Sequence, residues 1–322
     1  MRAAVYYKTG PPDVLHYEEV ADPPCSPGGV IIEVEAISIE GGDTLNRAGG
    51  EMAGSPHIVG YQCAGRIREV GEGVEDRRVG QRVVATMLYG SHAELVAVPA
   101  MLTWPVPEGA DIVAAACVPV PFGTADDCLF EFGHLQAGEA VLIQAGAGGV
   151  GLAAIQLAKR AGATVLATAS SDDRLDRLVP FGLDHGINYS RVDWVDAVRS
   201  ATSGNGVDLA VDSVGGSILL GSIQCLAYRG RCITVGNAGR DPRPLDVSLL
   251  AMGNQSLTGV FLGAEIVNDR ARAMIGRLVD DVAAGRLRVA VDRTFPLAEA
   301  AAAHAYVESR QAVGRVVLTP SV

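Results

Sequence analysis

The glycines at positions 146, 148 and 151 have a spacing that suits phosphate binding. They belong to the stretch Gly146-Ala147-Gly148-Gly149-Val150-Gly151, which follows an apolar run (140–145) and precedes a run rich in Ala and Leu (152–160). The first run is typical of a strand buried on both faces, and the second contains strong helix formers. In such a turn the glycines permit a tight bend, close approach of a pyrophosphate, and close packing of the helix on the strand. This context predicts a dinucleotide-binding loop rather than an ordinary glycine-rich turn.

Composition and charge indicate which partners to expect. The chain has 322 residues, 48% hydrophobic and 20% charged, which suits a globular protein of two domains. Its net charge of -11 disfavours nucleic acid and anionic membranes, because both reward a basic surface. The N-terminus reaches a polar, proline-rich segment too soon for a signal peptide, and no run has the apolar length of a membrane span. We therefore expect a cytoplasmic protein with no nucleic-acid or membrane partner.

The cysteines predict no metal site. The six of them, at 25, 63, 117, 128, 225 and 232, form neither a CxxC pair nor a Cys/His cluster with zinc spacing. We expect reduced and mostly buried thiols.

Two parts of the chain differ in their expected elements. Residues 1–98 contain short β-branched or alternating runs between Gly/Pro turns, which predicts an irregular antiparallel β domain resembling a barrel or sandwich. Beyond residue 140, strand and helix patterns alternate, which predicts a doubly wound parallel sheet of six strands with its ligand at the switch point. The six strands are expected at 141–145, 164–168, 186–189, 207–211, 231–235 and 256–260. Helices are expected at 111–117, 125–130, 172–179, 194–201, 218–226, 265–284 and 297–309, with a closing strand at 314–318.

Four segments, 34–49, 59–65, 79–83 and 92–94, resemble N-terminal landmarks of the medium-chain dehydrogenase/reductase superfamily. With the glycine loop added, the chain is similar to the zinc-independent quinone oxidoreductase-like branch over nearly its whole length. The resemblance implies an α/β chain with a β-rich, GroES-like catalytic domain (1–120 and 260–322) and a Rossmann cofactor domain (121–259). It also implies a homodimer formed by edge pairing of residues 256–260.

The chain departs from the family pattern at several positions. Zinc-dependent members carry a Cys-His pair near position 40 and Gly-His-Glu near position 60, where this chain has Glu40-Gly41 and Gly60-Tyr61-Gln62. It also lacks the four-cysteine lobe of the structural zinc, so activation of an alcohol by zinc is not expected. The quinone oxidoreductase-like pattern itself usually has Asn in place of Glu40, Glu in place of Gln62, and often Tyr in place of Leu45.

These departures direct attention to three candidate catalytic residues. We hypothesise that Glu40 contacts the nicotinamide end of the cofactor or donates a proton to the substrate, although drift between polar groups of similar size would explain the change equally well. Tyr61 is a second candidate proton donor. Asp43 matches the family motif and has either a catalytic role or an ion pair with Arg47. His92 is a candidate for the substrate cleft by position, with a packed role as the alternative.

Cofactor choice can be predicted from the charge at the end of the second strand of the cofactor domain. NAD-specific sheets usually place a carboxylate there to bond the ribose 2′-OH, but this strand ends in Ala169-Ser170. By resemblance Arg174 and Tyr189 bind a 2′-phosphate, which suits the planar fork of Arg. The carboxylates of residues 172–173 oppose this interpretation, and residues 170–173 also suit a helix N-cap. We expect NADPH rather than NADH.

The resemblance implies further cofactor contacts. Thr124 lies beside the nicotinamide, or else caps a helix at 125–130. Backbone contacts are expected at Val214 and Gly236, and these segments also suit ordinary sheet-exit turns. The remaining expected contacts are Gly146, Gly148, Gly149, Val150, Gly151, Ser170, Asn237 and Arg315.

Together these features predict an NADPH-dependent oxidoreductase that transfers hydride, without zinc, to an electrophilic small molecule. The acceptor is a quinone or an activated alkene such as an enone or enoyl thioester, because without zinc it must already be electrophilic or be polarised by hydrogen bonds. The alternative is a cofactor-binding structural or regulatory protein with little catalytic activity, because a fold and a cofactor site do not establish chemistry.

Overall fold

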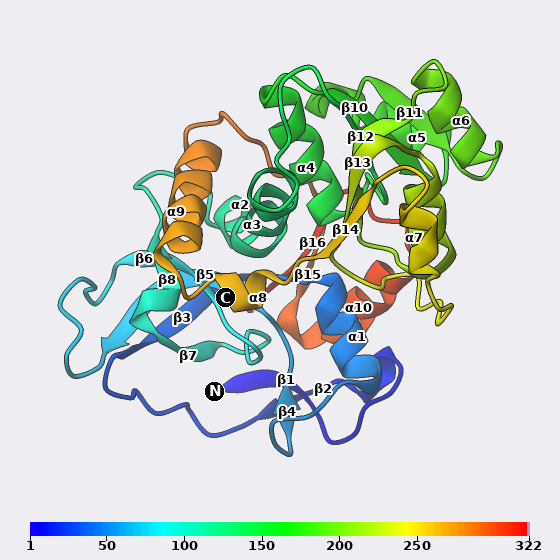
Figure 1. Ribbon diagram of the computed structural model, residues 1–322. Helices are drawn as coiled ribbons and strands as arrows, with labels where there is room; N and C mark the ends of the chain where they lie inside the picture. Colours follow the sequence, from blue (N-terminus) through cyan, green and yellow to red (C-terminus); the bar gives the residue numbers. More distant parts are fainter. Residues whose placement is uncertain (321–322) are drawn as a thin grey trace. The chain divides into compact units, whose positions relative to one another are not determined.

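The computed structural model describes residues 1–320, which form two compact units (Figure 1). Unit 1 contains Met1–Gly123 and the segment that begins at Gly263, and unit 2 contains Thr124–Leu262. The chain therefore crosses between units a few residues beyond each boundary expected from the sequence.

Unit 1 is built on two β-sheets. One has the order β2-β1-β4, and the other has the order β15-β16-β3-β5-β6-β8, with β7 also paired to β3. The strands are β1 (Arg2–Tyr6), β2 (His16–Glu19), β3 (Gly29–Ser38), β4 (His57–Ile58), β5 (Gln62–Val70), β6 (Arg82–Thr86), β7 (Leu95–Pro99), β8 (Thr103–Pro105), β15 (Val291–Pro296) and β16 (Arg315–Thr319). All pairs are antiparallel except β15 with β16, so the expected irregular antiparallel domain is confirmed.

Three strands of unit 1 were not expected from the sequence. β4 and β8 contain only two and three residues, too few to show an alternating pattern. β15 is polar, with Phe295 as its one buried residue, because only part of this edge strand covers the core. The central strand β3 was recognised from the sequence because six apolar residues and two charged residues follow Gly29 within it. Most of these side chains are buried.

The helices of unit 1 correct two expectations. Its helices are α1 (Gly41–Gly49), α2 (Ile112–Ala116), α9 (Asp269–Ala283) and α10 (Ala300–Glu308), while α3 (Pro119–Asp126) and α8 (Leu262–Glu265) each include residues of both units. The helix expected at 265–284 is divided, because the Asn268 side chain accepts the N–H of Ala271 (2.8 Å) and starts α9 afresh. The helix expected at 125–130 begins earlier, at Pro119, since proline is tolerated in a first turn.

Unit 2 is a parallel sheet of six strands in the order β11-β10-β9-β12-β13-β14, which confirms the doubly wound fold. The strands are β9 (Ala140–Ile143), β10 (Thr164–Ala169), β11 (His185–Asn188), β12 (Val207–Asp212), β13 (Leu226–Thr234) and β14 (Ser256–Gly259). The helices are α4 (Gly149–Arg160), α5 (Asp172–Asp176), α6 (Trp194–Ala201) and α7 (Gly216–Gln224). Figure 1 shows α4 and α7 on opposite sides of the strands.

Two local features of unit 2 follow from its sequence. α5 ends at Asp176, before the expected residue 179, and the chain continues in a 3₁₀ turn (Val179–Phe181), because Pro180 has no N–H to donate along an α-helix. The strand order reverses between β9 and β12, so the loops that follow these two strands lie at the switch point, where doubly wound sheets bind their ligands. No helix within residues 1–320 is both long and apolar enough to cross a membrane.

The core of unit 2 depends on the middle of β9. Leu142 is fully buried there and packs with Leu166 and Ala210 of the neighbouring strands. We expect Leu142→Ala to lower the free energy of unfolding by about 2–5 kcal/mol, because the cavity adds to the lost burial. Urea unfolding followed by circular dichroism measures this, with Leu249→Ala, a 38% exposed leucine of the same unit, as the control. Equal losses in the two variants would contradict the expectation.

Candidate functional site

The glycine loop of unit 2 joins β9 to α4. Gly148 is the N-cap of α4, and Gly149, Val150 and Gly151 form its first turn. A Cβ atom on Gly151 would lie 2.5 Å from the carbonyl oxygen of Ala145 and 2.7 Å from the Cα of Gly146. Only glycine therefore lets this helix begin so close to the strand. The first N–H groups of a helix have no partner within it, so this cradle fits the pyrophosphate of a dinucleotide.

A buried chain of hydrogen bonds connects the strand ends beside this loop. Thr168 donates to Gln144 Oε1 (2.6 Å), Gln144 Nε2 donates to the Ser222 hydroxyl (3.1 Å), and that hydroxyl donates to Asp212 Oδ2 (2.8 Å). The other carboxylate oxygen of Asp212 accepts the backbone N–H groups of residues 214 and 215, at 2.8 and 2.7 Å. This chain holds the turn that carries Val214. It escaped the sequence analysis, because polar residues at strand ends do not show which partners they meet.

The structure brings Val214, Gly236 and Asn237 together. The segment 236–239 lies against 213–214, because the N–H groups of Ala238 and Gly239 donate to the carbonyls of residues 213 and 214 (3.1 and 2.8 Å).

Thr124 lies inside α3 and is 6% exposed. Its expected alternative role as an N-cap is therefore wrong.

The residues expected to bind a 2′-phosphate gather where β10 and β11 end. Tyr189 donates its N–H to the carbonyl of Ala169 (3.2 Å) and is 46% exposed, and Ser190 donates its hydroxyl to the carbonyl of Ser170 (2.9 Å). Arg174 lies in α5, whose N-cap Ser171 accepts the Arg174 N–H (3.3 Å). Ser170, Arg174 and Tyr189 therefore belong to one corner of unit 2.

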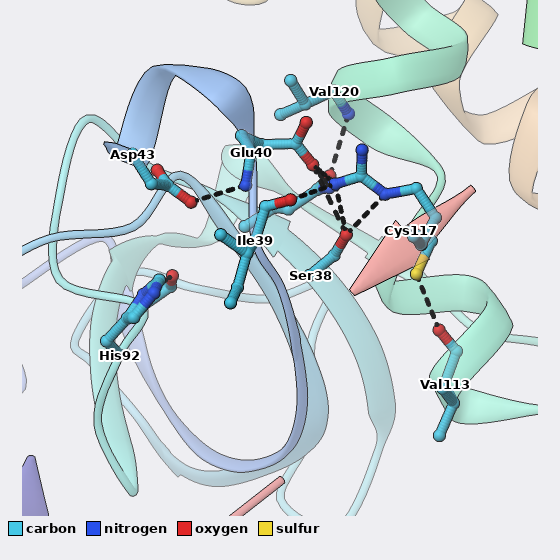
Figure 2. A network of polar contacts seen from close by, with 11 residues as sticks. Ser38, Ile39, Glu40, Asp43, His92, Val113, Cys117 and Val120 are labelled. Carbon is cyan, nitrogen blue, oxygen red and sulfur yellow. Dashed lines mark hydrogen bonds and ion pairs between the residues drawn. The ribbon is translucent and has the colours of Figure 1, made fainter. Parts of the chain in front are cut away.

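In unit 1, Glu40 lies at the end of β3 and is 5% exposed (Figure 2). Its Oε1 accepts hydrogen bonds from Ser38 Oγ (3.4 Å) and Gln62 Nε2 (2.5 Å) and forms an ion pair with Arg315. Arg315 also donates to Ser38 Oγ and to the Ile39 carbonyl, each at 2.6 Å. Burial raises the pKa of Glu40, and the Arg315 guanidinium opposes that shift. Arg315, expected to reach the cofactor, thus has part of its guanidinium occupied by Glu40.

Gln62 explains why two departures from the family pattern occur together. Its amide donates to Glu40 and its carbonyl oxygen accepts the N–H of Val120 (2.9 Å), so both ends of the amide are used. A glutamate at position 62 would place a second carboxylate against Glu40 without a hydrogen to donate. In this chain Glu40 provides the carboxylate and Gln62 provides the amide of one buried hydrogen bond.

Asp43 stabilises the start of α1. Its Oδ2 accepts the Glu40 N–H (2.8 Å), while its Oδ1 is buried without a hydrogen bond within the described chain. Burial raises the pKa of Asp43 well above its ordinary value. Arg47 forms its ion pair with Glu308 (2.5 Å), so the expected pair between Asp43 and Arg47 is not formed.

Tyr61 packs its ring directly on α1. A Cβ atom on Gly42 would lie 3.0 Å from the phenol oxygen and would overlap the ring, and Asn46 Nδ2 donates to the same oxygen (2.7 Å). Burial and the nearby Asp43 raise the pKa of Tyr61 to about 12. The phenol is therefore protonated at neutral pH, and its hydrogen is available because its oxygen accepts from Asn46. The sequence analysis missed Gly42 and Asn46, although their i, i+4 spacing places them on one face of a helix.

His92 is a core residue rather than a cleft residue. It is fully buried, its Nε2 lies 3.0 Å from Nε2 of His304, and its Nδ1 lies 3.3 Å from Ser91 Oγ. Burial lowers the pKa of His92 to about 3. The cysteines are all free thiols, and residues 1–320 contain no group of three or more His, Cys, Asp or Glu side chains arranged to hold a metal ion.

Comparison with known proteins finds family models, relatives and solved structures that are similar to this chain. Residues 26–108 match the family model described as alcohol dehydrogenase GroES-like domain, and residues 149–280 match zinc-binding dehydrogenase. A 2-haloacrylate reductase of a Burkholderia species is 37% identical over 329 residues, covering 99% of this chain and 98% of that protein. Quinone oxidoreductase-like protein 2 of Rattus norvegicus is 31% identical over 323 residues, covering 99% and 92%. The crystal structure of Escherichia coli quinone oxidoreductase complexed with NADPH has a TM-score of 0.94 and 28% identity, covering 99% of this chain and 100% of that one.

The buried histidine pair predicts a pH dependence of stability. Burial lowers the pKa of both His92 and His304, so the folded chain keeps them neutral while the unfolded chain protonates them below pH ~6.5. Their contribution to stability is thus present above this pH. It falls as the pH drops towards 3, by about 1.4 kcal/mol per pH unit for each histidine.

Urea unfolding between pH 7 and pH 4 measures this slope. We expect His92→Gln to reduce the slope of unfolding free energy against pH by about 1.4 kcal/mol per pH unit, because one fewer proton is then taken up on unfolding. His16→Gln, at an exposed histidine, should leave the slope unchanged. An unchanged slope in the His92 variant would contradict the assignment.

Proposed function

The chain belongs to the medium-chain dehydrogenase/reductase superfamily, in its quinone oxidoreductase-like branch of NAD(P)H-dependent reductases, and we propose that it reduces electron-poor carbon–carbon double bonds with NADPH and without zinc. The observation that carries this proposal is the phenol of Tyr61, which packs on Gly42 and accepts a hydrogen bond from Asn46. Reduction of an alkene places one hydride and one proton on carbon. A quinone takes up its protons on oxygen, where water supplies them, and needs no such donor.

The cofactor proposal rests on unit 2. When bound, NADPH supplies the hydride. The glycine cradle fits its pyrophosphate, and we assign Ser170, Arg174 and Tyr189 to its 2′-phosphate. The turns that carry Val214, Gly236 and Asn237, together with Thr124, are assigned to its ribose and nicotinamide. The Escherichia coli relative was crystallised with NADPH, which supports the choice of cofactor.

Proton transfer is assigned to Tyr61. Once hydride has been added to the β-carbon of the alkene, the electron pair of the double bond resides on the α-carbon and its electron-withdrawing group. The Tyr61 O–H bond then breaks as the α-carbon–hydrogen bond forms. Asn46 continues to donate to the phenolate oxygen, and water returns the proton. A pKa of about 12 suits this task, because the phenol keeps its proton until a strongly basic carbanion appears.

Glu40, Asp43 and Arg315 are proposed to position this donor. Oε1 of Glu40 is already bound by Ser38, Gln62 and Arg315 within unit 1, so this carboxyl group has its partners in the protein itself. Asp43 binds the N–H of Glu40 and so determines where α1 begins. We therefore favour Tyr61 over Glu40 as the proton donor.

Residues that zinc-dependent relatives use as ligands have other partners in this chain. Glu40 occupies the position of the cysteine and pairs with Arg315, and Tyr61 occupies the position of the histidine and accepts from Asn46. Carboxylate–guanidinium and phenol–amide contacts of this kind support a reaction without zinc. The acceptor must then be electrophilic by itself, as a 2-haloacrylate or an enoyl thioester is.

The first test compares three acceptors. NADPH oxidation is followed with 2-chloroacrylate, a short enoyl thioester and a simple quinone, with NADH as a second donor and with product identification. We expect an alkene to be reduced, and Tyr61→Phe to lower kcat for that alkene by about 10²–10⁴ while binding NADPH normally. Tyr7→Phe, an exposed tyrosine of the same unit, is the matched control.

Two results would contradict this proposal. One is reduction of the quinone alone by the unaltered enzyme. The other is full alkene turnover by Tyr61→Phe with an unchanged pH profile.

We also propose that the protein is a homodimer joined through β14, which is the last strand in its sheet. An edge strand offers unpaired backbone groups for pairing with a second copy. Val260 donates its N–H to Thr234 within the sheet, so the N–H of Gly259 points to the free edge. We expect Gly259→Pro to yield a monomer and Gly259→Ala to remain a dimer in light scattering, since the added Cβ meets no atom within 4 Å. A monomeric unaltered protein would contradict this.

A further inference from the structure

Arg191 and Asp172 form an ion pair at the corner where β10 and β11 end. Asp172 is the first residue of α5, and its other carboxylate oxygen accepts a hydrogen bond from Asn188 Nδ2 (2.7 Å). Ala169 of β10 is in register with Asn188 of β11, so the loops after these strands are neighbours. In a doubly wound sheet, the end of the second strand is where the adenosine ribose of a dinucleotide binds.

Acidic residues at this corner create an electrostatic problem. Asp172 and Asp173 favour the positive N-terminal end of α5, but carboxylates here repel a 2′-phosphate. Left uncompensated, they would favour NADH. The guanidinium of Arg191 neutralises Asp172 and adds a donor fork that suits phosphate.

Breaking this ion pair also costs little free energy. The side chains of Arg191 and Asp172 are 72% and 52% exposed, and such exposed pairs contribute little to stability. Arg191 can therefore leave Asp172 at low cost, while Asn188 continues to hold the carboxylate.

We propose that Arg191 is a specificity-determining residue that pairs with Asp172 in the free protein and binds the 2′-phosphate of NADPH when the cofactor is present. This inference rests on the proposed use of NADPH and adds a residue to the phosphate corner of Arg174 and Tyr189. It assigns Arg191 two partners in turn, one in the protein and one on the ligand.

The test is a double-mutant cycle on cofactor affinity, with dissociation constants of NADPH and NADH measured by calorimetry and no substrate present. Arg191→Ala should weaken NADPH about tenfold or more and leave NADH nearly unchanged, because a charge-assisted contact to phosphate is lost. Asp172→Asn should strengthen NADPH, since it removes both the repulsion and the competing partner. In the Asp172→Asn background, Arg191→Ala should still weaken NADPH, because the contact to phosphate is direct.

A matched control is Lys159→Ala. Lys159 is also half exposed and paired, with Asp184 (2.6 Å), but Asp184 lies just before β11, at the opposite end of the strands. The Lys159→Ala variant removes one positive charge from unit 2, as Arg191→Ala does, and should leave the affinity for NADPH unchanged.

The outcomes separate this inference from the cofactor proposal. If Arg191→Ala has no effect on NADPH in the Asp172→Asn background, Arg191 acts only by screening Asp172 and the exchange of partners is overturned. An equal loss of affinity in the Lys159 variant would overturn it as well, because the effect would then be one of net charge. If the unaltered protein binds NADH as tightly as NADPH, the proposed NADPH preference itself fails.

Discussion

The buried ion pair between Glu40 and Arg315 is the interaction on which unit 1 depends. The two residues are 275 positions apart, and their contact joins the end of β3 to β16 in a unit built from both ends of the chain. Burying two charges costs desolvation energy, which is offset here by Ser38, Gln62 and the Ile39 carbonyl. Removing one partner of such a pair typically costs about 3–5 kcal/mol, because the other charge remains buried.

This ion pair also lies at the start of the helix on which Tyr61 packs. α1 begins directly after Glu40, and Asp43 in its first turn binds the Glu40 N–H. Gly42 and Asn46 of the same helix then form the surface on which the phenol rests. A residue without direct contact to the reacting atoms can therefore decide where the proposed proton donor lies.

In unit 2 the limiting constraint is close backbone approach. Gly151 lets α4 begin close to the end of β9, and Gly146 fits closely against Ala167 of β10. The chain of hydrogen bonds from Thr168 to Asp212 holds the neighbouring strand ends. These contacts place backbone N–H groups at the start of α4, where we propose that the phosphates bind. In our proposal, the charge at the adjacent corner selects NADPH over NADH, and it is carried by exposed side chains outside the packed core.

The sequence by itself determined the six-stranded sheet, the glycine loop and the β-rich character of unit 1, because hydrophobic periodicity and glycine spacing are local properties. The resemblance to the family motif also placed Glu40, Asp43 and Tyr61 among the candidate residues. Only the tertiary structure decided their partners: Arg315 for Glu40, Asn46 for Tyr61, and Arg191 for Asp172. The physical reason is that a hydrogen bond or ion pair depends on separation in space, which spacing along the chain does not reveal for residues on different elements.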